Sequence, residues 1–522
     1  MRDFARLLDG LAFTPSRNGK LRLIGAYMRD TPDPGRGYAL AALTGSLDLP
    51  GAKPAAIRGL VAERVDPTLF ALSYDYVGDL AETTALIWPE GEEAPAPPQL
   101  VDVVEALLSA SKSETLKLLP AWLDVLDADA RWALLKLATG GLRVGVSARL
   151  AKVAVAEAFA ADVGEIEEVW HGLEPPFQPL FDWLEGKAER PDPNAGAAFR
   201  PMMLANPLDE TTLERMPPED YLAEWKWDGI RVQAVSRGGE RRLFSRTGDD
   251  IGHSFPDVIE AMDFEGVVDG ELLIRAEPDS GEPAPFAVLQ KRLGRKRPGP
   301  KLIRESRAFV RVYDMLFAGT EDIRAKPLAD RRRHLEAWEA PKAFDLSPLV
   351  SFATWEDLQA LRDGARAAGV EGLMLKAKAS PYVAGRPQGP WHKWKREPLT
   401  LDLVLMYAQR GHGRRSSYYS DLTFGAWVEP DRLAPVAKAY SGYSDDELLE
   451  IDRWVRRNTV ERFGPVRSVT PGLVMELAFD SAQASTRHKS GVALRFPRIK
   501  RIRWDKPIDE AETLDGVKAL ID

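Results

Sequence analysis

The chain contains no cysteine. This absence excludes disulfide bonds, thiol nucleophiles and zinc sites built on cysteine, and it is compatible with a reducing cytosol. The sequence also lacks an uninterrupted apolar run of about 18 residues, the length needed to span a bilayer. Charges interrupt the apolar residues of the N-terminal segment, so this segment does not read as a signal peptide. We therefore expect a soluble, cytoplasmic protein without a membrane partner.

An excess of positive charge is absent too. The chain has 70 Lys and Arg against 79 Asp and Glu, a net charge of −9, so the whole molecule is not a polycation that seeks nucleic acid. Any such binding must come from local clusters, and one candidate for contacts with nucleic-acid backbone phosphates lies at 291–301. With 44% hydrophobic and 29% charged residues, the composition is that of an ordinary folded protein. Its 522 residues predict three or four domains, at roughly 150 residues each.

Three kinds of pattern divide the chain. Apolar residues recur at helical spacing up to about residue 185, as in Phe4, Leu7, Leu8 and Leu11. A Pro-, Gly- and Ala-rich stretch at 186–207 is typical of a linker, and we place a boundary near 197. The predicted fold class is multidomain, with the following three domains: an all-α domain at 1–197, an α+β domain at 198–397 with alternating strand and helix patterns, and a small β-barrel at 398–522 with one helix at 445–463.

A lysine with possible chemistry stands in the segment EWKWDGIR at 224–231. Lys226 follows a strand pattern and precedes an Asp-Gly turn, and by itself the segment also fits an exposed lysine before a hairpin. A lysine amine attacks phosphorus only when it is unprotonated, so a nucleophilic lysine needs burial or neighbouring cations. The functional interpretation therefore predicts further basic groups that converge on Lys226.

Further segments of this kind follow in order along the chain. They are SRTG at 245–248, DGE at 269–271, YD at 313–314, EGLMLK at 371–376 and KWK at 393–395. With these segments the chain resembles the covalent nucleotidyltransferases, and specifically the ATP-dependent DNA ligases. Chance agreement of several ordered segments is far less probable than agreement of one.

The residue types suit the chemistry that this resemblance implies. Glu271 and Glu371 are hard oxygen donors, suited to Mg²⁺ or to ribose hydroxyls, although each alone could be a solvated acid. Tyr313 offers a ring on which adenine can stack, or it is a core tyrosine of its strand. Lys393 and Lys395, two apart on a strand, point the same way and could reach one phosphate, or they form an exposed strand face.

The resemblance implies a role for each residue. Lys226 is the catalytic nucleophile, Arg246 contacts the 5′-phosphate of a nick, and Glu371 and Glu271 hold metal, while Glu271 also meets the ribose. No role is assigned to Asp228. The segments LRFPRI at 494–499 and RWDK at 503–506 resemble the ligase signature of a terminal OB-fold. The residues implied in ATP or AMP binding are Glu224, Arg231, Glu271, Tyr313, Lys393, Lys395, Arg498, Arg503 and Lys506.

The helical third resembles the DNA-binding domain of the larger, eukaryotic-type ligases. The matching stretches lie at 37–45, 77–83 and 140–146. Arg143, between Gly141 and Gly145, is the candidate for a DNA contact, because glycines allow a duplex to approach the backbone closely. For each glycine, a helix stop is nearly as good an interpretation.

The expected activity is ATP-dependent sealing of 5′-phosphate/3′-hydroxyl nicks in double-stranded DNA, through lysyl-AMP and adenylylated DNA. The implied cofactors are ATP and Mg²⁺ or another divalent cation, and the implied enzyme is a monomer. Frequent Ala, Arg, Gly and Pro are typical of a GC-rich bacterial genome. RNA ligases and capping enzymes share the lysine chemistry and are the alternatives. NAD-dependent ligases fit less well, because the zinc finger that they usually carry needs cysteine. A catalytically inactive DNA-binding scaffold is a further alternative.

Overall fold

The computed structural model describes residues 1–49, 51–89, 96–192, 196–277, 280–293, 295, 297–411 and 417–521. The chain divides into two compact units. Unit 1 comprises Met1–Ala160, Pro175–Gln178 and Pro398–Asp522, and unit 2 comprises Ala161–Glu174 and Pro179–Glu397. The C-terminal strands are thus grouped with the N-terminal helices, and a short part of the helical third is grouped with the central sheets.

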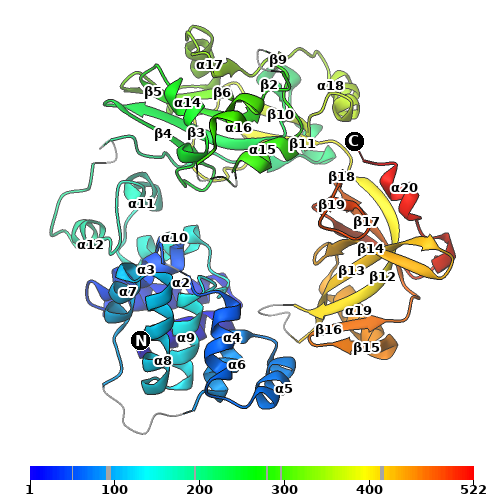
Figure 1. Cartoon of the computed structure of the whole chain (residues 1–522). Helices are drawn as coiled ribbons and strands as arrows, with labels where there is room; N and C mark the ends of the chain where they lie inside the picture. The colour runs from blue at the N-terminus through cyan, green and yellow to red at the C-terminus, as the bar shows by residue number, and fades with distance from the viewer. Residues whose placement is uncertain are drawn as a thin grey trace. The chain divides into compact units, whose positions relative to one another are not determined.

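The N-terminal part of unit 1 is helical, as the spacing of its apolar residues predicts. Phe4, Leu7, Leu8 and Leu11 are all buried on one side of the first helix. Gly140 follows the ninth helix with a φ of +70°, a backbone conformation that ends helices and favours glycine. The helices (Figure 1) are α1 (Arg2–Phe13), α2 (Arg17–Asp30), α3 (Gly35–Thr44), α4 (Pro54–Ala62), α5 (Pro67–Val77), α6 (Leu80–Ile87), α7 (Leu100–Ser109), α8 (Lys112–Val125), α9 (Ala128–Ala138) and α10 (Ala148–Ala158).

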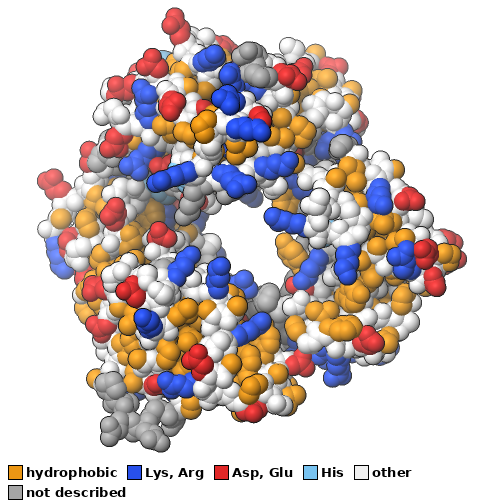
Figure 2. Space-filling view, in the orientation of Figure 1, with side chains coloured by type: hydrophobic (Ala, Val, Ile, Leu, Met, Phe, Trp, Pro, Cys, Tyr) orange, Lys and Arg blue, Asp and Glu red, His pale blue; other side chains and the backbone are white. Residues whose placement is uncertain are grey.

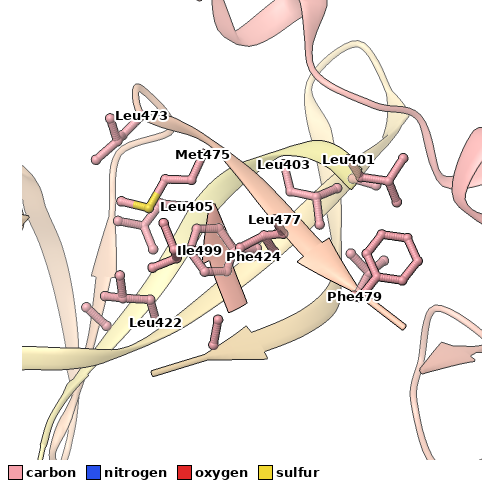
Figure 3. Packing of buried hydrophobic residues seen from close by; sticks show 14 of the residues in the cluster. Leu401, Leu403, Leu405, Leu422, Phe424, Leu473, Met475, Leu477, Phe479 and Ile499 are labelled. Carbon is pink, nitrogen blue, oxygen red and sulfur yellow. The ribbon is translucent and has the colours of Figure 1, made fainter. Parts of the chain in front are cut away.

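The C-terminal part of unit 1 is rich in strands. Antiparallel pairing gives a seven-stranded sheet in the order β14-β13-β12-β16-β15, with β17 joining β12 to β20, and a separate β18-β19 pair. Alternate side chains of β12, β13 and β17 meet in one apolar core, which Figure 3 shows from close by. The elements are β12 (Leu399–Arg410), β13 (Tyr419–Glu429), β14 (Arg432–Ala439), α19 (Asp445–Asn458), β15 (Thr459–Phe463), β16 (Val466–Val469), β17 (Val474–Phe479), β18 (Ser481–Ala484), β19 (Val492–Arg495), β20 (Arg498–Arg503) and α20 (Leu514–Lys518).

One boundary in this part was predicted wrongly. The helix expected at 445–463 ends at Asn458, and Thr459–Phe463 forms β15, paired with β16. The segment TVERF begins with β-branched residues, and pairing with a neighbouring strand outweighs continuation of the helix. Among the described residues, no strand pairing closes the seven-stranded sheet on itself, so the barrel stays a prediction.

Unit 2 contains two sheets and several short helices, which agrees with the predicted mixture of strands and helices. The first has the strand order β1-β11-β10-β2-β9, and the second has the order β4-β3-β5-β6-β7 with β8 beside β6. The strands are β1 (Asn206–Pro207), β2 (Tyr221–Trp225), β3 (Ile230–Arg237), β4 (Glu240–Ser245), β5 (Gly266–Ile274), β6 (Ala308–Ala318), β7 (Glu321–Asp322), β8 (Phe344–Leu346), β9 (Leu349–Val350), β10 (Gly372–Ala377) and β11 (Trp391–Lys395).

Short helices accompany these sheets, and α17 packs against β6. The helices are α11 (Val163–Trp170), α12 (Gln178–Leu184), α13 (Glu210–Leu213), α14 (Pro256–Glu260), α15 (Phe286–Leu293), α16 (Pro300–Glu305), α17 (Leu328–Glu336) and α18 (Trp355–Asp363). Within the described ranges, no helix combines the length and the apolar character needed to cross a membrane.

The second half of the expected linker is not a solvated connection. Phe199, Met202 and Met203 are buried in a core cluster of unit 2, and Asn206–Pro207 forms β1 beside β11. Burial of these three apolar side chains offsets the weak strand and helix propensity of the segment. Residues 193–195 of the expected linker lie outside the described residues.

Candidate active site

Lys226 lies directly after β2, where the main chain still follows the ladder with β10. The amide of Lys226 donates to the carbonyl of Gly372 (2.8 Å), and the amide of Glu371 donates to the carbonyl of Lys226 (2.8 Å). On the other side of β10, Gly372 pairs with Lys395 of β11. Strand pairing therefore brings Lys226, Glu371 and Lys395 to one end of one sheet.

The side chains of these three residues meet. Nζ of Lys226 donates to Oε2 of Glu371 at 2.5 Å, and Nζ of Lys395 lies 3.1 Å from the same oxygen. Burial alone would raise the pKa of Glu371, but the charges of Lys226 and Lys395 hold that pKa below its usual range. The Lys226 side chain keeps 22% of its surface exposed. The amine is thus held by a carboxylate, on a side chain that is partly exposed.

Glu271 lies close to this group from the second sheet. It pairs across the ladder with Arg231, and a Cβ added at Gly229 would lie 2.8 Å from its Cγ. Burial raises the pKa of Glu271 from its ordinary 4.5 to about 7, and the negative charges of Glu371 and Asp228 add to this shift against the opposing effect of Lys226 and Arg231. The two predicted metal-binding glutamates therefore lie close enough for the charge of Glu371 to raise the pKa of Glu271.

Arg231 is fixed by a network of hydrogen bonds. Its guanidinium donates to the carbonyl of Met203 (2.6 Å), to Oδ2 of Asp269 (2.8 Å) and to the hydroxyl of Tyr382 (3.2 Å). The Tyr382 hydroxyl also donates to Asp269. A guanidinium held on three sides loses little conformational entropy when an anion binds.

Tyr313 lies beside two cations. The Nζ of Lys376 is 4.3 Å from the centre of the Tyr313 ring, and the Arg231 guanidinium carbon is 5.8 Å from it. Burial raises the pKa of the Tyr313 hydroxyl well above its usual range. Tyr313 is therefore a neutral, half-buried ring at the same site.

Glu224 takes part in a buried ion pair. Its Oε2 accepts from Nζ of Lys376 at 2.8 Å, its Oε1 lies 3.5 Å from Arg332, and only 4% of its side chain is exposed. The carboxylate of Glu224 is thus held by protein cations in this structure. Its predicted contact with the nucleotide stays a prediction.

More cations converge on the same place. Burial lowers the pKa of Lys393, and the nearby charges of Arg386, Lys395 and Lys226 lower it further. Burial also lowers the pKa of Arg246, with contributions from Arg231 and Arg386. Figure 2 shows Lys and Arg side chains gathered over the edge of unit 2 along which Figure 1 labels β3, β4, α15 and β11. Such a group of cations suits a polyanionic ligand.

The carboxylates at this site suit a hard cation that binds water or phosphate in addition to the protein. Among the described residues, no three or more acidic or histidine side chains form a group that could hold a metal by themselves. Glu271 and Glu371 supply carboxylate oxygens, and Mg²⁺ usually binds one or two carboxylates together with water and substrate phosphates. The donor set therefore fits a divalent cation that arrives with a nucleotide.

Two family models match this chain. The model described as ATP dependent DNA ligase domain matches residues 202–395, and the model described as ATP dependent DNA ligase C terminal region matches residues 415–506. A probable DNA ligase of Koribacter versatilis is 31% identical over 100% of this chain and 96% of its own length. DNA ligase 1 of Korarchaeum cryptofilum is also 31% identical, over 100% of this chain and 98% of its own length.

The chain belongs to the ATP-dependent DNA ligases. The resemblance inferred from the ordered segments is thereby confirmed. A solved structure named "Pmar-Lig_Pre." shares the fold with a TM-score of 0.62, over 96% of this chain and 99% of that chain, at 17% identity. The helical N-terminal region, the adenylation domain and the strand-rich C-terminal region are those of a DNA ligase.

The predicted C-terminal cations of the ligase lie in unit 1. Arg503 and Lys506 both pair with Oδ2 of Asp402, at 3.1 and 2.9 Å, and Arg503 also pairs with Asp505. Arg498 lies 3.3 Å from Asp480. These three cations are thus held by carboxylates of their own region.

Arg143 lies in the loop after α9. It is exposed, and its φ of +48° places it in the left-handed region. The loop is tied to α2 because the buried Lys20 donates from Nζ to the carbonyls of Val144 (2.6 Å) and Gly145 (3.0 Å). The fold therefore holds Arg143 in a shaped, solvent-facing loop, and its contact with DNA stays a prediction.

Sequence reasoning missed some residues of this site and misjudged another. Four residues that were not predicted lie among the predicted ones: Arg386, Lys376, Asp269 and Tyr382. Asp269 and Lys376 belong to the family segments 269–271 and 371–376, whereas no segment indicated Arg386 or Tyr382. Within the basic cluster at 291–301, Arg292 is fully buried in an ion pair with Asp257, so it cannot contact DNA phosphates.

Proposed function

We propose that this ligase seals nicks through a covalent lysyl-AMP on Lys226. The observation that supports the proposal is the Lys226 amine, held by Glu371 beside Lys393, Lys395 and Arg246. In the first step Nζ bonds to the α-phosphorus of ATP, and the bond to the bridging oxygen breaks as pyrophosphate leaves. The Lys226–Glu371 ion pair stabilises the ammonium, so the pair must open and Nζ must release a proton to solvent before attack. Nζ loses a second proton to solvent as the bond to phosphorus forms.

Two further transfers complete the reaction. An oxygen of the nick 5′-phosphate attacks the AMP phosphorus and displaces Nζ of Lys226. The 3′-hydroxyl then attacks the activated 5′-phosphate, loses its proton and releases AMP. Lys393, Lys395 and Arg246 stabilise the negative charge that develops on the phosphates.

The other side chains bind and orient the nucleotide in this proposal. Tyr313 stacks on adenine, Arg231 and Glu224 contact the bound nucleotide, and Glu271 meets the ribose. Glu271 and Glu371 would hold Mg²⁺ or another divalent cation, which neutralises phosphate charge when bound. Arg498, Arg503 and Lys506 orient the β,γ-phosphates of ATP, and Arg143 contacts the duplex.

The domain boundaries belong to the proposal as well. We assign 1–197 to DNA binding, 198–397 to adenylation and 398–522 to an OB-fold, and the apolar core that β12, β13 and β17 share supports the last assignment. The ligase is proposed to act as a cytoplasmic monomer on nicked double-stranded DNA.

A sealing assay tests this function. The wild-type ligase is incubated with a labelled nicked DNA duplex, ATP and Mg²⁺, and the variant Lys226→Ala is its comparison. We expect joined strands from the wild type and none from the variant. Sealing of RNA ends in preference to nicked DNA would favour the RNA ligase alternative, and DNA binding without AMP transfer would favour the scaffold.

A further inference from the structure

The segment Ala161–Glu174, which contains α11, packs with the adenylation unit although its sequence pattern continues the helical third. Oε1 of Glu168 accepts from the Arg324 guanidinium at 2.5 Å, and Arg324 also pairs with Asp322 at 2.7 Å. Each partner of the Glu168–Arg324 pair is only 20% exposed. The end of α11 is therefore anchored on unit 2 by a half-buried ion pair.

His171, directly after α11, packs onto the loop that carries Arg246. A Cβ built on Gly248 would lie 2.2 Å from Cε1 of His171 and 2.9 Å from both ring nitrogens. The same imidazole meets Phe199 edge-on at 4.6 Å, and Phe199 meets Phe244 of β4 at 5.7 Å. The ring thus fills the space between the Gly248 backbone and an aromatic row of the core.

The loop itself is a tight turn. The amide of Ser245 donates to the carbonyl of Asp249 (2.8 Å), and the amide of Gly248 donates to the carbonyl of Ser245 (3.0 Å). The Ser245 hydroxyl also donates to the carboxylate of Asp249 at 3.1 Å. Because these bonds tie both ends of the turn together, a ring that fixes Gly248 also fixes the backbone of Arg246.

We propose that His171 is a positioning residue for Arg246. Its imidazole holds the 245–249 turn so that the Arg246 guanidinium stays beside Arg231 and Arg386, where the 5′-phosphate of the nick arrives. The inference rests on the proposed function, because the role of Arg246 belongs to it. It adds that a residue of the helical third, with no motif around it, sets the geometry for AMP transfer to DNA.

The experiment separates the reaction steps in the full-length ligase. Lysyl-AMP formation is measured with α-labelled ATP, and AMP transfer is measured in a single turnover of pre-adenylylated enzyme on a nicked duplex. We expect His171→Ala to form lysyl-AMP within about twofold of the wild-type rate, and to transfer AMP about 10- to 100-fold more slowly because the arginine is misplaced. His171→Phe keeps an aromatic ring on Gly248 and is expected to restore most of the rate.

Two comparisons make this result specific. His334→Ala removes a half-buried histidine of α17 in the same unit and should leave AMP transfer unchanged. In a double-mutant cycle, His171→Ala should add little to the loss caused by Arg246→Ala, because the histidine acts through the arginine. Wild-type transfer by His171→Ala, or fully multiplicative losses in the cycle, would overturn the inference. Absence of lysyl-AMP in the wild type would instead overturn the proposed function.

Discussion

Two sets of cations in this ligase differ in how the fold holds them. Lys226, Lys393 and Lys395 are placed by the backbone ladder of β2, β10 and β11 in unit 2. Arg503 and Lys506 lie at and after the end of β20 in unit 1, and their head groups share the carboxylate of Asp402. A carboxylate holds head groups of both sets, but Lys226 and Lys395 share Glu371 in the unit that also contains Glu271 and Tyr313, whereas Arg503 and Lys506 share Asp402 in the other unit. We infer that the first set carries the chemistry of every step and the second serves ATP.

The largest effect should come from the carboxylate at the centre of the first set. Glu371→Gln removes the charge that holds Lys226 and one of the two donors for a divalent cation. We expect lysyl-AMP formation to fall by about 10²- to 10³-fold. Glu321→Gln is the control, since Glu321 also pairs with a lysine, Lys326 at 2.8 Å, in the same unit. A wild-type rate of lysyl-AMP formation in Glu371→Gln would show that this carboxylate has no role in that step.

The second set should matter in only one step. Arg503→Ala is expected to slow lysyl-AMP formation from ATP by about 10- to 100-fold, because a cation for the leaving pyrophosphate is lost. Sealing of a nick that already carries AMP should stay close to the wild-type rate. Lys500→Ala, on the same strand and paired with Glu476 at 3.0 Å, is the control. Equal losses in lysyl-AMP formation and in sealing of the AMP-carrying nick would show that the second set does not act in the ATP step alone.

The backbone that places the first set can be disturbed directly. Gly372 has a φ of +138°, and a Cβ there would lie 2.3 Å from the carbonyl oxygen of Trp394. Gly372→Ala should therefore lower the free energy of unfolding by about 1–3 kcal/mol and also slow lysyl-AMP formation. Gly389 also has a positive φ, but no atom of the described residues lies within 4 Å of its Cβ position. If Gly389→Ala lowers the free energy of unfolding as much as Gly372→Ala does, the positive φ explains the loss of stability at Gly372 and the contact with Trp394 does not.

The smallest effect concerns pH and Glu271. Burial raises its pKa from 4.5 to about 7. Between pH 4.5 and about 7, Glu271 therefore holds a proton in the folded ligase that it has lost in the unfolded chain. The stability contributed by this proton is present at low pH and is lost as the pH rises through about 7. Glu271→Gln should flatten this decline in the free energy of unfolding, measured by urea titration at about pH 5 and pH 7.5. An unchanged slope would show that Glu271 does not titrate there.

The sequence predicted those parts of the site that motifs and strand patterns reveal. Lys226, Glu371 and Lys395 come from ordered segments, and the strands expected before Lys226 and at Lys393 and Lys395 are observed as β2 and β11. Arg386 gave no signal, because it stands in the loop between β10 and β11 outside every motif. The pairing of Glu224 with Lys376 depends on the register of β2 against β10, which no local pattern specifies.

The helical third shows the same limit in another way. Its apolar spacing predicted helices correctly, but α11 has the same kind of pattern and packs with unit 2 instead. Which core a helix joins depends on partners such as Arg324 and Phe199, which are distant in sequence. Periodicity identifies the buried face of a helix and not the surface that covers it.

Lysyl-AMP formation on Lys226 is tested most directly by peptide mapping with mass spectrometry, after incubation of the ligase with ATP and Mg²⁺. We expect one AMP per chain, located on the peptide that contains Lys226 and removed again by excess pyrophosphate. AMP on a different residue, or no covalent AMP on an enzyme that still seals nicks, would contradict this expectation.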